Sequence, residues 1–244
     1  HRILRPLVNA MADVRLGCGE AANRWMYGKR ESVVIKNGID TCLYRFDATT
    51  RIQVRKELGI GDEVTVIGHV GGYNRQKNQQ MLMYILKAIE AKNPSKDFCL
   101  ISVGRGHTQK DVEQLASKLG VDGKVRFLGQ RTDVPKLLNA MDMFFLPSLF
   151  EGFPIVAIEA QTAGLPLVIA DTISKEVELT NLVHWLPIDK GAEVWAEKYY
   201  QIAHTKVNRV QYAPIVERKG FDARHSAQIL QDIYVKNILR NENS

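Results

Sequence analysis

From residue 64 onward, short apolar runs alternate with stretches in which apolar residues recur at helical spacing. The apolar runs are rich in β-branched and aromatic residues and cover residues 64–70, 98–104, 124–129, 143–148, 165–170 and 182–187. Near-continuous apolar strands separated by helices are typical of a parallel sheet that is covered on both faces. The pattern therefore predicts a doubly wound α/β domain.

Helical spacing is clear in two of the intervening stretches. Residues 78–92 place five apolar side chains on one face: Met81, Leu82, Ile85, Leu86 and Ile89. The stretch from Asp133 to Ala140 opens with an aspartate at a capping position. Both stretches are predicted to be helices of the α/β domain.

The two ends of the chain do not follow this alternation. Residues 1–46 begin with a helix pattern, which is followed by a strand candidate at 12–19 and a second helix pattern at 21–28. Asn37-Gly38 predicts a turn. The tail from about Phe221 to Arg240 is predicted to form one long helix.

Composition places the chain among ordinary globular proteins, with 45% hydrophobic and 25% charged residues, so disordered and fibrous classes are excluded. No apolar run approaches the ~18 residues that a membrane span needs. The chain starts at His1 and lacks the apolar core and cleavage site of a signal peptide. We therefore expect a piece of a longer protein.

The net charge of +6 is concentrated at the two ends of the chain. Residues 1–30 have six basic and two acidic side chains (+4), residues 206–244 have seven and four (+3), and residues 31–205 have 20 and 21 (−1). No basic stripe with interleaved aromatic residues crosses the body, so we expect no nucleic-acid partner. The basic ends are expected to face a partner domain or an anionic membrane surface.

The cysteines Cys18, Cys42 and Cys99 are far apart and form no CxxC pattern, and no two histidines have HxH or HxxxH spacing. A disulfide framework and a metal site are therefore disfavoured. This cysteine usage fits a reducing cytosol.

Parallel α/β sheets bind ligands beyond the carboxyl ends of their strands, which directs attention to residues 69–78, 104–108 and 148–154. In the last loop, Pro154 suits the first turn of a helix, so the amides of Gly152 and Phe153 would lie at the positive end of its dipole, where a phosphate binds. Glu151 and Glu159 would repel a phosphate and are interpreted as acceptors for sugar and ribose hydroxyls. The alternative is a capping glutamate and a helix glutamate paired with a basic residue.

In the first loop, Gly71 and Gly72 permit close backbone approach, and Lys77 directly precedes the predicted helix at 78–92. A cation at a helix N-terminus opposes the helix dipole and so suggests a bound anion, toward which Arg75 could add a second positive charge. The alternative is a solvated loop without a ligand.

Gly104 and Gly106 predict a tight turn beside a nucleotide. The third glycine of a dinucleotide fingerprint is missing, and Gly104 and Arg105 stand where an acidic residue would bind the ribose. An NAD-dependent oxidoreductase is therefore disfavoured.

Together, these loops resemble the C-terminal half of a retaining glycosyltransferase of family 4, group 1, in which two Rossmann-like domains form the GT-B architecture. The resemblance runs from about Ala12 to the C-terminus and is most specific in residues 142–171, where Glu151 and Glu159 match the glutamates of the family's E-x7-E motif. The variant looks most like capsular or exopolysaccharide transferases. The resemblance implies a Rossmann-like doubly wound sheet over residues 35–220.

The resemblance also implies roles for single residues. Glu151 would contact the donor sugar, Glu159 would hold the ribose, and Lys77 would bind phosphate. The diphosphate would meet the backbone at Gly152, Phe153, Pro154 and Ile155. Other residues beside the nucleotide would be Gly71, Gly72, Gly104, Gly106 and, in the loop that meets the base, Arg131.

One position departs from the family pattern, which reads G-R-x-x-x-x-K followed by Gly or Asn. Here Gly72 stands in place of the arginine, which ordinarily helps to neutralise the leaving diphosphate. Arg75 is the candidate substitute. Without one, the site would bind a nucleotide and catalyse poorly, so a catalytically silent nucleotide-sugar-binding module is the alternative function.

The implied function is transfer of a sugar from a nucleotide-sugar, with a UDP-sugar as the expected donor, to a polysaccharide or lipid-linked acceptor, without a metal or other cofactor. Residues 1–34 are expected to be the end of an N-terminal domain with its linker, and residues 221–244 a helix that packs back toward that domain. The family's acceptor site lies in that N-terminal domain, so this part of the enzyme is not expected to transfer sugar by itself. A cytoplasmic location, with peripheral contact at the inner membrane face, is expected.

Overall fold

The computed structural model describes residues 4–95 and 97–242. The chain divides into two compact units, one of residues 41–216 and one formed by the segments up to Asp40 and from Glu217 onward. The domain boundaries expected after residues 34 and 220 stay predictions.

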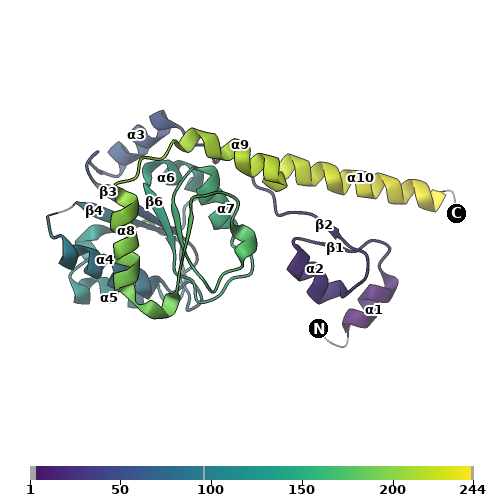
Figure 1. Ribbon diagram of the computed structural model, residues 1–244, viewed down its shortest axis with the longest axis horizontal. Coiled ribbons are helices and arrows are strands. Elements are labelled where there is room, and N and C mark those ends of the chain that lie inside the picture. Colours follow the sequence, from purple (N-terminus) through teal and green to yellow (C-terminus); the bar gives the residue numbers. More distant parts are fainter. Residues whose placement is uncertain (1–3, 96, 243–244) are drawn as a thin grey trace. The chain divides into compact units, whose positions relative to one another are not determined.

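The larger unit is built around a six-stranded parallel sheet with the order β5-β4-β3-β6-β7-β8 (Figure 1). The strands are β3 (Thr65–Val70), β4 (Phe98–Val103), β5 (Val125–Phe127), β6 (Met143–Leu146), β7 (Leu167–Ala170) and β8 (Val183–Leu186). Each strand lies within one of the six predicted apolar runs. The predicted α/β fold with a doubly wound parallel sheet is therefore confirmed.

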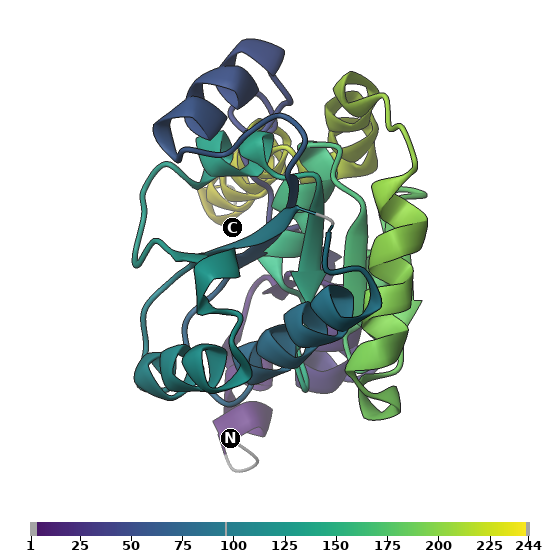
Figure 2. The same ribbon diagram turned by 90° about the vertical axis from the view of Figure 1, so that its left-hand side faces the viewer.

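Helices cover both faces of this sheet. The helices α4 (Gln79–Lys92), α5 (Gln109–Leu119) and α8 (Ala192–Ala203) lie on one face, and α6 (Val134–Ala140) and α7 (Ile155–Thr162) lie on the other (Figures 1 and 2). All four side chains of β6, and all four of β7, are fully buried. Burial from both sides explains why these strands appear in the sequence as uninterrupted apolar runs.

The two predicted helices are present. The stretch at 78–92 forms α4, with Asn78 as its N-cap in the left-handed region (φ 54°), and Asp133 is the N-cap of α6. The helices α3 (Ala48–Glu57) and α9 (Tyr212–Val216) have no counterpart among the predicted elements. Short 3-10 segments complete the unit: Asp122–Lys124, Lys175–Val177, Ile188–Lys190 and Arg209–Gln211.

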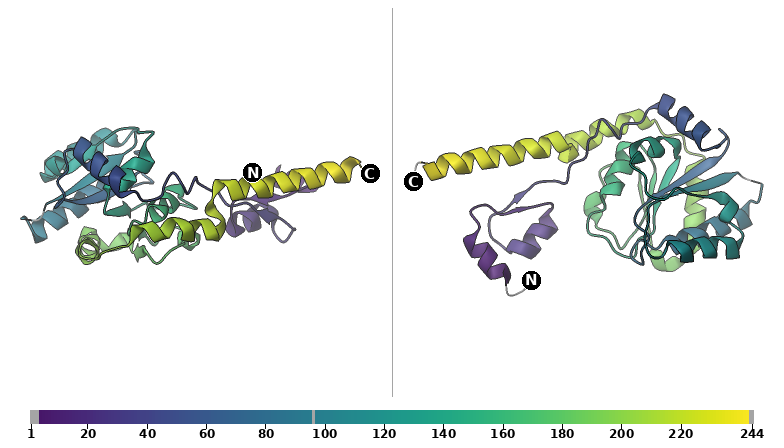
Figure 3. Two further views of the ribbon diagram at one scale, coloured as in Figure 1. Left: turned by 90° about the horizontal axis from the view of Figure 1, so that it is seen from above. Right: turned by 180° about the vertical axis from the view of Figure 1, so that it is seen from behind.

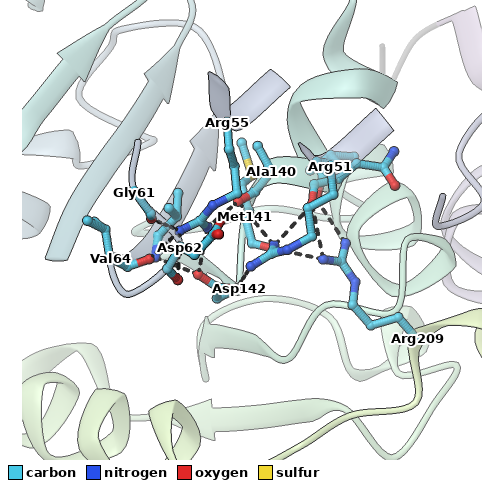
Figure 4. A network of polar contacts seen from close by, with 12 residues as sticks. Arg51, Arg55, Gly61, Asp62, Val64, Ala140, Met141, Asp142 and Arg209 are labelled. Atoms are coloured by element: carbon cyan, nitrogen blue, oxygen red, sulfur yellow. Dashed lines mark hydrogen bonds and ion pairs between the residues drawn. The ribbon is translucent and has the colours of Figure 1, made fainter. Parts of the chain in front are cut away.

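Three arginines enclose the C-terminal end of α6, next to the amino end of β6 (Figure 4). Arg51 pairs with Asp142 at 2.6 Å, and Arg55 pairs with the same carboxylate at 3.3 Å. Arg209 donates four hydrogen bonds of 2.8–3.3 Å to the carbonyls of Leu138, Asn139, Met141 and Ala163. The cluster therefore satisfies helix-end carbonyls that lack partners within their own helix.

The smaller unit contains α1 (Leu4–Met11), β1 (Leu16–Gly17), α2 (Glu20–Tyr27), β2 (Val33–Val34), a π-helical turn (Glu217–Phe221) and α10 (Ala223–Glu242). β1 and β2 pair in parallel, so the strand candidate at 12–19 and the helix predicted at 21–28 are both present. The predicted tail helix is α10, a single continuous helix (Figure 3). Within residues 4–95 and 97–242, no helix combines the length and the hydropathy that a membrane crossing requires.

The chain bends at the predicted Asn37-Gly38 turn, where the Gly38 N–H donates to the Lys36 carbonyl at 2.8 Å. Ile39 then pairs with Asp222 in a parallel bridge. A Cβ at Gly38 would lie only 2.8 Å from backbone atoms of Ala223, so this close approach requires glycine. Asp222 caps α10 by accepting a hydrogen bond of 3.0 Å from the Arg224 N–H.

Candidate functional site

The loops that follow β3 and β6 meet at the carboxyl edge of the sheet. From β3 the sheet continues through β4 and β5, and from β6 it continues the other way through β7 and β8, so the strand order reverses between these two neighbours. The Leu149 N–H donates to the Gln76 carbonyl at 2.8 Å, and the Asn78 side chain donates to the Pro147 carbonyl at 3.1 Å. Doubly wound sheets bind their ligands at such a reversal.

Lys77 and Glu151, which come from these two loops, form an ion pair with 2.6 Å between Nζ and Oε2. The Ser148 hydroxyl donates to the other carboxylate oxygen, Oε1, at 2.5 Å. The side chains of Lys77 and Glu151 are 17% and 8% exposed, and Ser148 is fully buried. The structure thus brings two predicted site residues together and adds a serine that the sequence interpretation missed, although it stands three residues before Glu151.

The helix α7 begins one residue later than expected, because Pro154 is its N-cap instead of a member of its first turn. The N–H groups of Gly152, Ile155 and Val156 have no hydrogen-bond acceptor within the described ranges. The Gly152 N–H lies just before α7, and the other two lie in its first turn, at the positive end of the helix dipole. The sequence pointed to the amides of Gly152 and Phe153, whereas the structure leaves those of Gly152, Ile155 and Val156 without acceptors. Backbone donors at a helix start can bind an anion, and the anion site stays a prediction.

Glu159, in the middle of α7, accepts a hydrogen bond of 2.8 Å from the Tyr44 hydroxyl. Burial raises the pKa of the Glu159 carboxyl, and the Tyr44 bond acts in the opposite direction. The sequence did not predict Tyr44, because nothing in residues 41–47 marks a ligand contact. The Glu159 carboxylate therefore already accepts a hydrogen bond from one hydroxyl group. A hydroxyl is also the group of the ribose that the family resemblance assigns to it.

The predicted glycines have different roles. A Cβ at Gly104 (φ 142°) would overlap the Gly71 carbonyl, and one at Gly106 would overlap the Tyr73 carbonyl. These two glycines are explained by the packing of the loop after β4 against the loop after β3. Gly72 is exposed, and a Cβ there would lie 3.6 Å from its nearest neighbour, the Arg105 carbonyl oxygen, so a Cβ can be accommodated.

Among the described residues, neither of the two predicted arginines forms an ion pair with Glu151. Arg131 forms two hydrogen bonds of 2.7 Å with the Asp133 carboxylate, and this contact lowers the pKa of Asp133. Arg75 is exposed and lines an open hollow of about 470 Å³ together with His107 and Phe150. Among the residues that the structure describes, none forms an ion pair with Arg75.

His69, in β3, is a buried side chain beside the site that the sequence did not select. Its Nδ1 donates to the Phe145 carbonyl at 3.0 Å, which leaves Nε2 as an acceptor without a partner in the described part of the chain. Burial lowers the pKa of His69 to about 4, and the nearby Lys77 charge acts in the same direction. The only sequence signal is a histidine inside the apolar run at 64–70.

This arrangement fits a ligand that carries both an anionic group and hydroxyls. Lys77 and the N–H groups at the start of α7 attract an anion, whereas Glu151 and Glu159 accept hydrogen bonds from hydroxyls. Across residues 4–95 and 97–242, no three side chains of His, Cys, Asp or Glu gather closely enough to hold a metal ion.

Residues 64–203 match the protein family described as "Glycosyl transferases group 1". EpsF of Bacillus subtilis, which is named as a glycosyltransferase, is 30% identical over 239 residues, which are 95% of this chain and 62% of EpsF. An Escherichia coli UDP-Gal:alpha-D-GlcNAc-diphosphoundecaprenol alpha-1,3-galactosyltransferase is 33% identical over 141 residues, 57% of this chain and 36% of the enzyme. The chain therefore spans less than two thirds of either relative.

Solved structures show the same fold. Anabaena HepE in complex with UDP superposes with a TM-score of 0.77 and 25% identity, covering 96% of this chain and 67% of HepE. A glycosyltransferase from Rickettsia africae superposes with a TM-score of 0.77 and 18% identity, covering 99% of this chain and 68% of that protein.

Proposed function

The chain belongs to the group 1 glycosyl transferases, and on this premise we propose that its six-stranded sheet domain is the donor-binding part of a retaining glycosyltransferase. The donor is a nucleotide-sugar, specifically a UDP-sugar. The acceptor is a growing polysaccharide, of the capsular or exopolysaccharide kind, or a lipid-linked saccharide.

The observation that carries this proposal is the joint position of Lys77, Glu151 and the free N–H groups at the start of α7, beside the reversal between β3 and β6. One cation and several backbone donors suit a diphosphate, and two carboxylates suit the hydroxyls of a sugar and a ribose. The presence of UDP in HepE supports the choice of base.

In the proposed reaction, Lys77 and the N–H groups of Gly152, Ile155 and Val156 stabilise the charge that develops on the departing nucleoside diphosphate. Glu151 and Glu159 accept hydrogen bonds from the donor sugar and the ribose. The acceptor hydroxyl attacks the anomeric carbon from the face that the diphosphate leaves, so the configuration is retained. Lys77 and the amides supply the positive charge for this step, and the proposed reaction is therefore independent of a metal or other cofactor.

The proposal assigns the acceptor site to a further domain. In the smaller unit, Leu7, Met11 and Trp25 are 57%, 73% and 59% exposed, and exposed apolar side chains of this kind support a protein partner.

The excess of basic residues in 1–30 and 206–244 supports a cytoplasmic protein at the anionic inner face of a membrane. Binding of the full-length protein to anionic vesicles should weaken at high salt, and binding that ignores salt and lipid charge would contradict this membrane contact.

The catalytically silent binding module remains the second candidate because Gly72 occupies the position of the family's arginine. Comparing Arg75→Ala with Lys77→Ala for sugar transfer in the full-length protein decides whether Arg75 acts as the substitute. Loss of transfer in both variants supports an active enzyme that uses both cations. Full transfer by Arg75→Ala would rule out the substitution, and nucleotide binding without any turnover in the wild type would favour the silent module.

Calorimetric titration of this chain with UDP and with GDP tests the donor site itself. We expect UDP to bind, and Glu159→Ala to weaken that binding because a ribose contact is lost. Glu90→Ala, which removes a partly exposed glutamate of α4 that pairs with Lys87, is the control and should bind like the wild type. If neither nucleotide binds to the wild type or to Glu151→Gln, the proposed function is wrong.

A further inference from the structure

The Lys77 ammonium group is already occupied by a carboxylate in this structure. Its Nζ lies 2.6 Å from Glu151 Oε2, and the whole Lys77 side chain is only 17% exposed. A diphosphate bound at the start of α7 would require the same ammonium group. Close contact of Lys77 with both anions would also bring the anions themselves together, which is electrostatically unfavourable.

We propose that a nucleoside diphosphate displaces Glu151 from Lys77, and that Ser148 holds the displaced carboxylate in place for the donor sugar. This inference rests on the proposed donor-binding function and adds an order of events to it. The charge of the diphosphate opens the ion pair first, and a sugar hydroxyl then occupies the carboxylate oxygen that Lys77 has left.

Only the end of Lys77 has to move for this exchange. Its backbone N–H is held by the Asn74 side chain at 3.0 Å, and its Cδ and Cε lie 3.4 Å from the point where a Cβ of Gly71 would be. The stem is therefore packed over a glycine. An ammonium group is a compact charge on a flexible stem, so rotation about the last side-chain bonds redirects it without disturbing the loop.

Glu151, in contrast, is fixed at both its backbone and its other carboxylate oxygen. The Ser174 N–H donates to the Glu151 carbonyl at 3.4 Å, and the Ser148 hydroxyl holds Oε1 at 2.5 Å. Ser148 is itself fully buried, and its carbonyl accepts a hydrogen bond of 2.9 Å from the Thr172 hydroxyl. Departure of Lys77 therefore exposes Oε2 while the carboxylate keeps its orientation.

The displaced carboxylate explains a preference for the complete donor. Glu151 is 8% exposed, and a mostly buried carboxylate that has lost its cation is unfavourable until another donor reaches it. A sugar hydroxyl on the donor can reach Oε2, whereas UDP alone brings no sugar to this position. The exchange thus favours a UDP-sugar over UDP and gives Ser148 a positioning role.

The decisive variant is Glu151→Gln, which keeps the shape of the side chain but no longer competes for Lys77 as an anion. Titration calorimetry on the full chain should show that Glu151→Gln binds UDP and inorganic pyrophosphate about tenfold more tightly than the wild type. A tenfold change in the dissociation constant corresponds to about 1.4 kcal/mol of binding free energy. Glu90→Gln removes the same charge from another glutamate ion-paired to a lysine, 3.1 Å from Lys87 on α4, and should leave both affinities unchanged.

A second variant, Ser148→Ala, tests the positioning role. We expect it to weaken the binding of UDP-glucose, used as the probe, while UDP binds as in the wild type, because Ser148 acts only on the carboxylate that meets the sugar. A melting temperature near that of the wild type shows that the buried site has kept its fold. A change in folding alone would alter both affinities together, and that result would overturn the role of Ser148.

Other outcomes separate the exchange from the proposed function. If the wild type binds UDP and Glu151→Gln binds it equally well or more weakly, the exchange is overturned and the proposed function stands. Absence of UDP and pyrophosphate binding in both proteins would overturn the exchange together with the proposed function. Binding by Glu151→Gln alone would support the competition, because it would show that Glu151 blocks the anion.

Discussion

The fold keeps His69 neutral. Its ring is buried in β3, and its pKa is lowered to about 4 from an ordinary value of 6.5. Because the pKa is depressed in the folded state, the unfolded chain takes up a proton first as the pH falls. The stabilising contribution is thus fully present above pH 6.5 and is lost as the pH falls toward 4.

We predict that His69→Gln flattens this part of the pH profile. Between pH 6.5 and 4, the free energy of unfolding of the wild type should fall by roughly 3 kcal/mol more than that of the variant, since one pKa unit corresponds to about 1.36 kcal/mol. Urea denaturation at several pH values measures the difference. Parallel profiles for the two proteins would show that His69 is not the group responsible.

Gly72 offers a test of charge at the donor site. The position has room for a side chain, because a Cβ there would lie 3.6 Å from its nearest neighbour, the Arg105 carbonyl oxygen. Gly72→Arg should restore a second cation and tighten UDP binding by on the order of tenfold, because hydrogen bonds to charged groups contribute about 1.5–3 kcal/mol. Gly72→Leu adds bulk without charge and should not tighten binding, and equal gains in both variants would speak against an electrostatic effect.

The candidate site could be predicted from single residues only where their chemistry was distinctive. Lys77, Glu151 and Glu159 stand in motifs, and Gly152 to Ile155 follow a predicted strand. The pairing of Lys77 with Glu151 was not predictable, because the two residues are 74 positions apart and the motif of each points to a ligand. Ser148 and Tyr44 were missed because their function depends on which side chain they contact, and the local sequence does not show this.

The ends of α6 and α7 are joined by hydrogen bonds from Arg209. Arg209 supplies donors to four carbonyls near the ends of α6 and α7, and all three nitrogens of its guanidinium group take part. Arg51 also donates to the carbonyls of Asn139 and Met141, so removal of the Arg209 guanidinium takes the donor from the buried Leu138 and Ala163, which is costly.

We therefore predict that Arg209→Met lowers the free energy of unfolding by roughly 3–5 kcal/mol, the usual cost of breaking a buried charged network. Arg209→Lys should recover only part of this, because one ammonium group cannot reach four carbonyls in the same geometry. Lys92→Met is the control: Lys92 and its ion-pair partner Glu197 are 54% and 62% exposed, so the pair contributes little. Similar melting temperatures for Arg209→Met and Lys92→Met would contradict the prediction.

The strands of the sheet were predictable because they are buried. Strands covered on both faces consist of apolar residues, so β3, β4, β6 and β7 are visible in the sequence. The helix α3 was not predicted because most of its residues are polar, and its buried positions include the charged residue Arg55. Apolar spacing cannot reveal a helix that is anchored by guanidinium groups.

The larger unit has its own core, and the whole sheet and all proposed donor contacts lie within residues 41–216. We predict that a fragment of these residues unfolds in one cooperative transition and binds UDP with the affinity of the full chain. Circular dichroism during heating and titration calorimetry measure the two properties. A fragment that melts without cooperativity would show that the terminal segments are part of the folding unit.

The neighbouring strands β3 and β6 pair Ile67 with Met143 and Gly68 with Phe144, although β4 and β5 come between them in the chain. Pairings between such distant segments are slow to form during folding. Because Lys77 follows one of these strands and Glu151 the other, the site assembles only when the two halves of the sheet have joined. A nucleotide that binds there will stabilise finished molecules and will not hold partly folded ones.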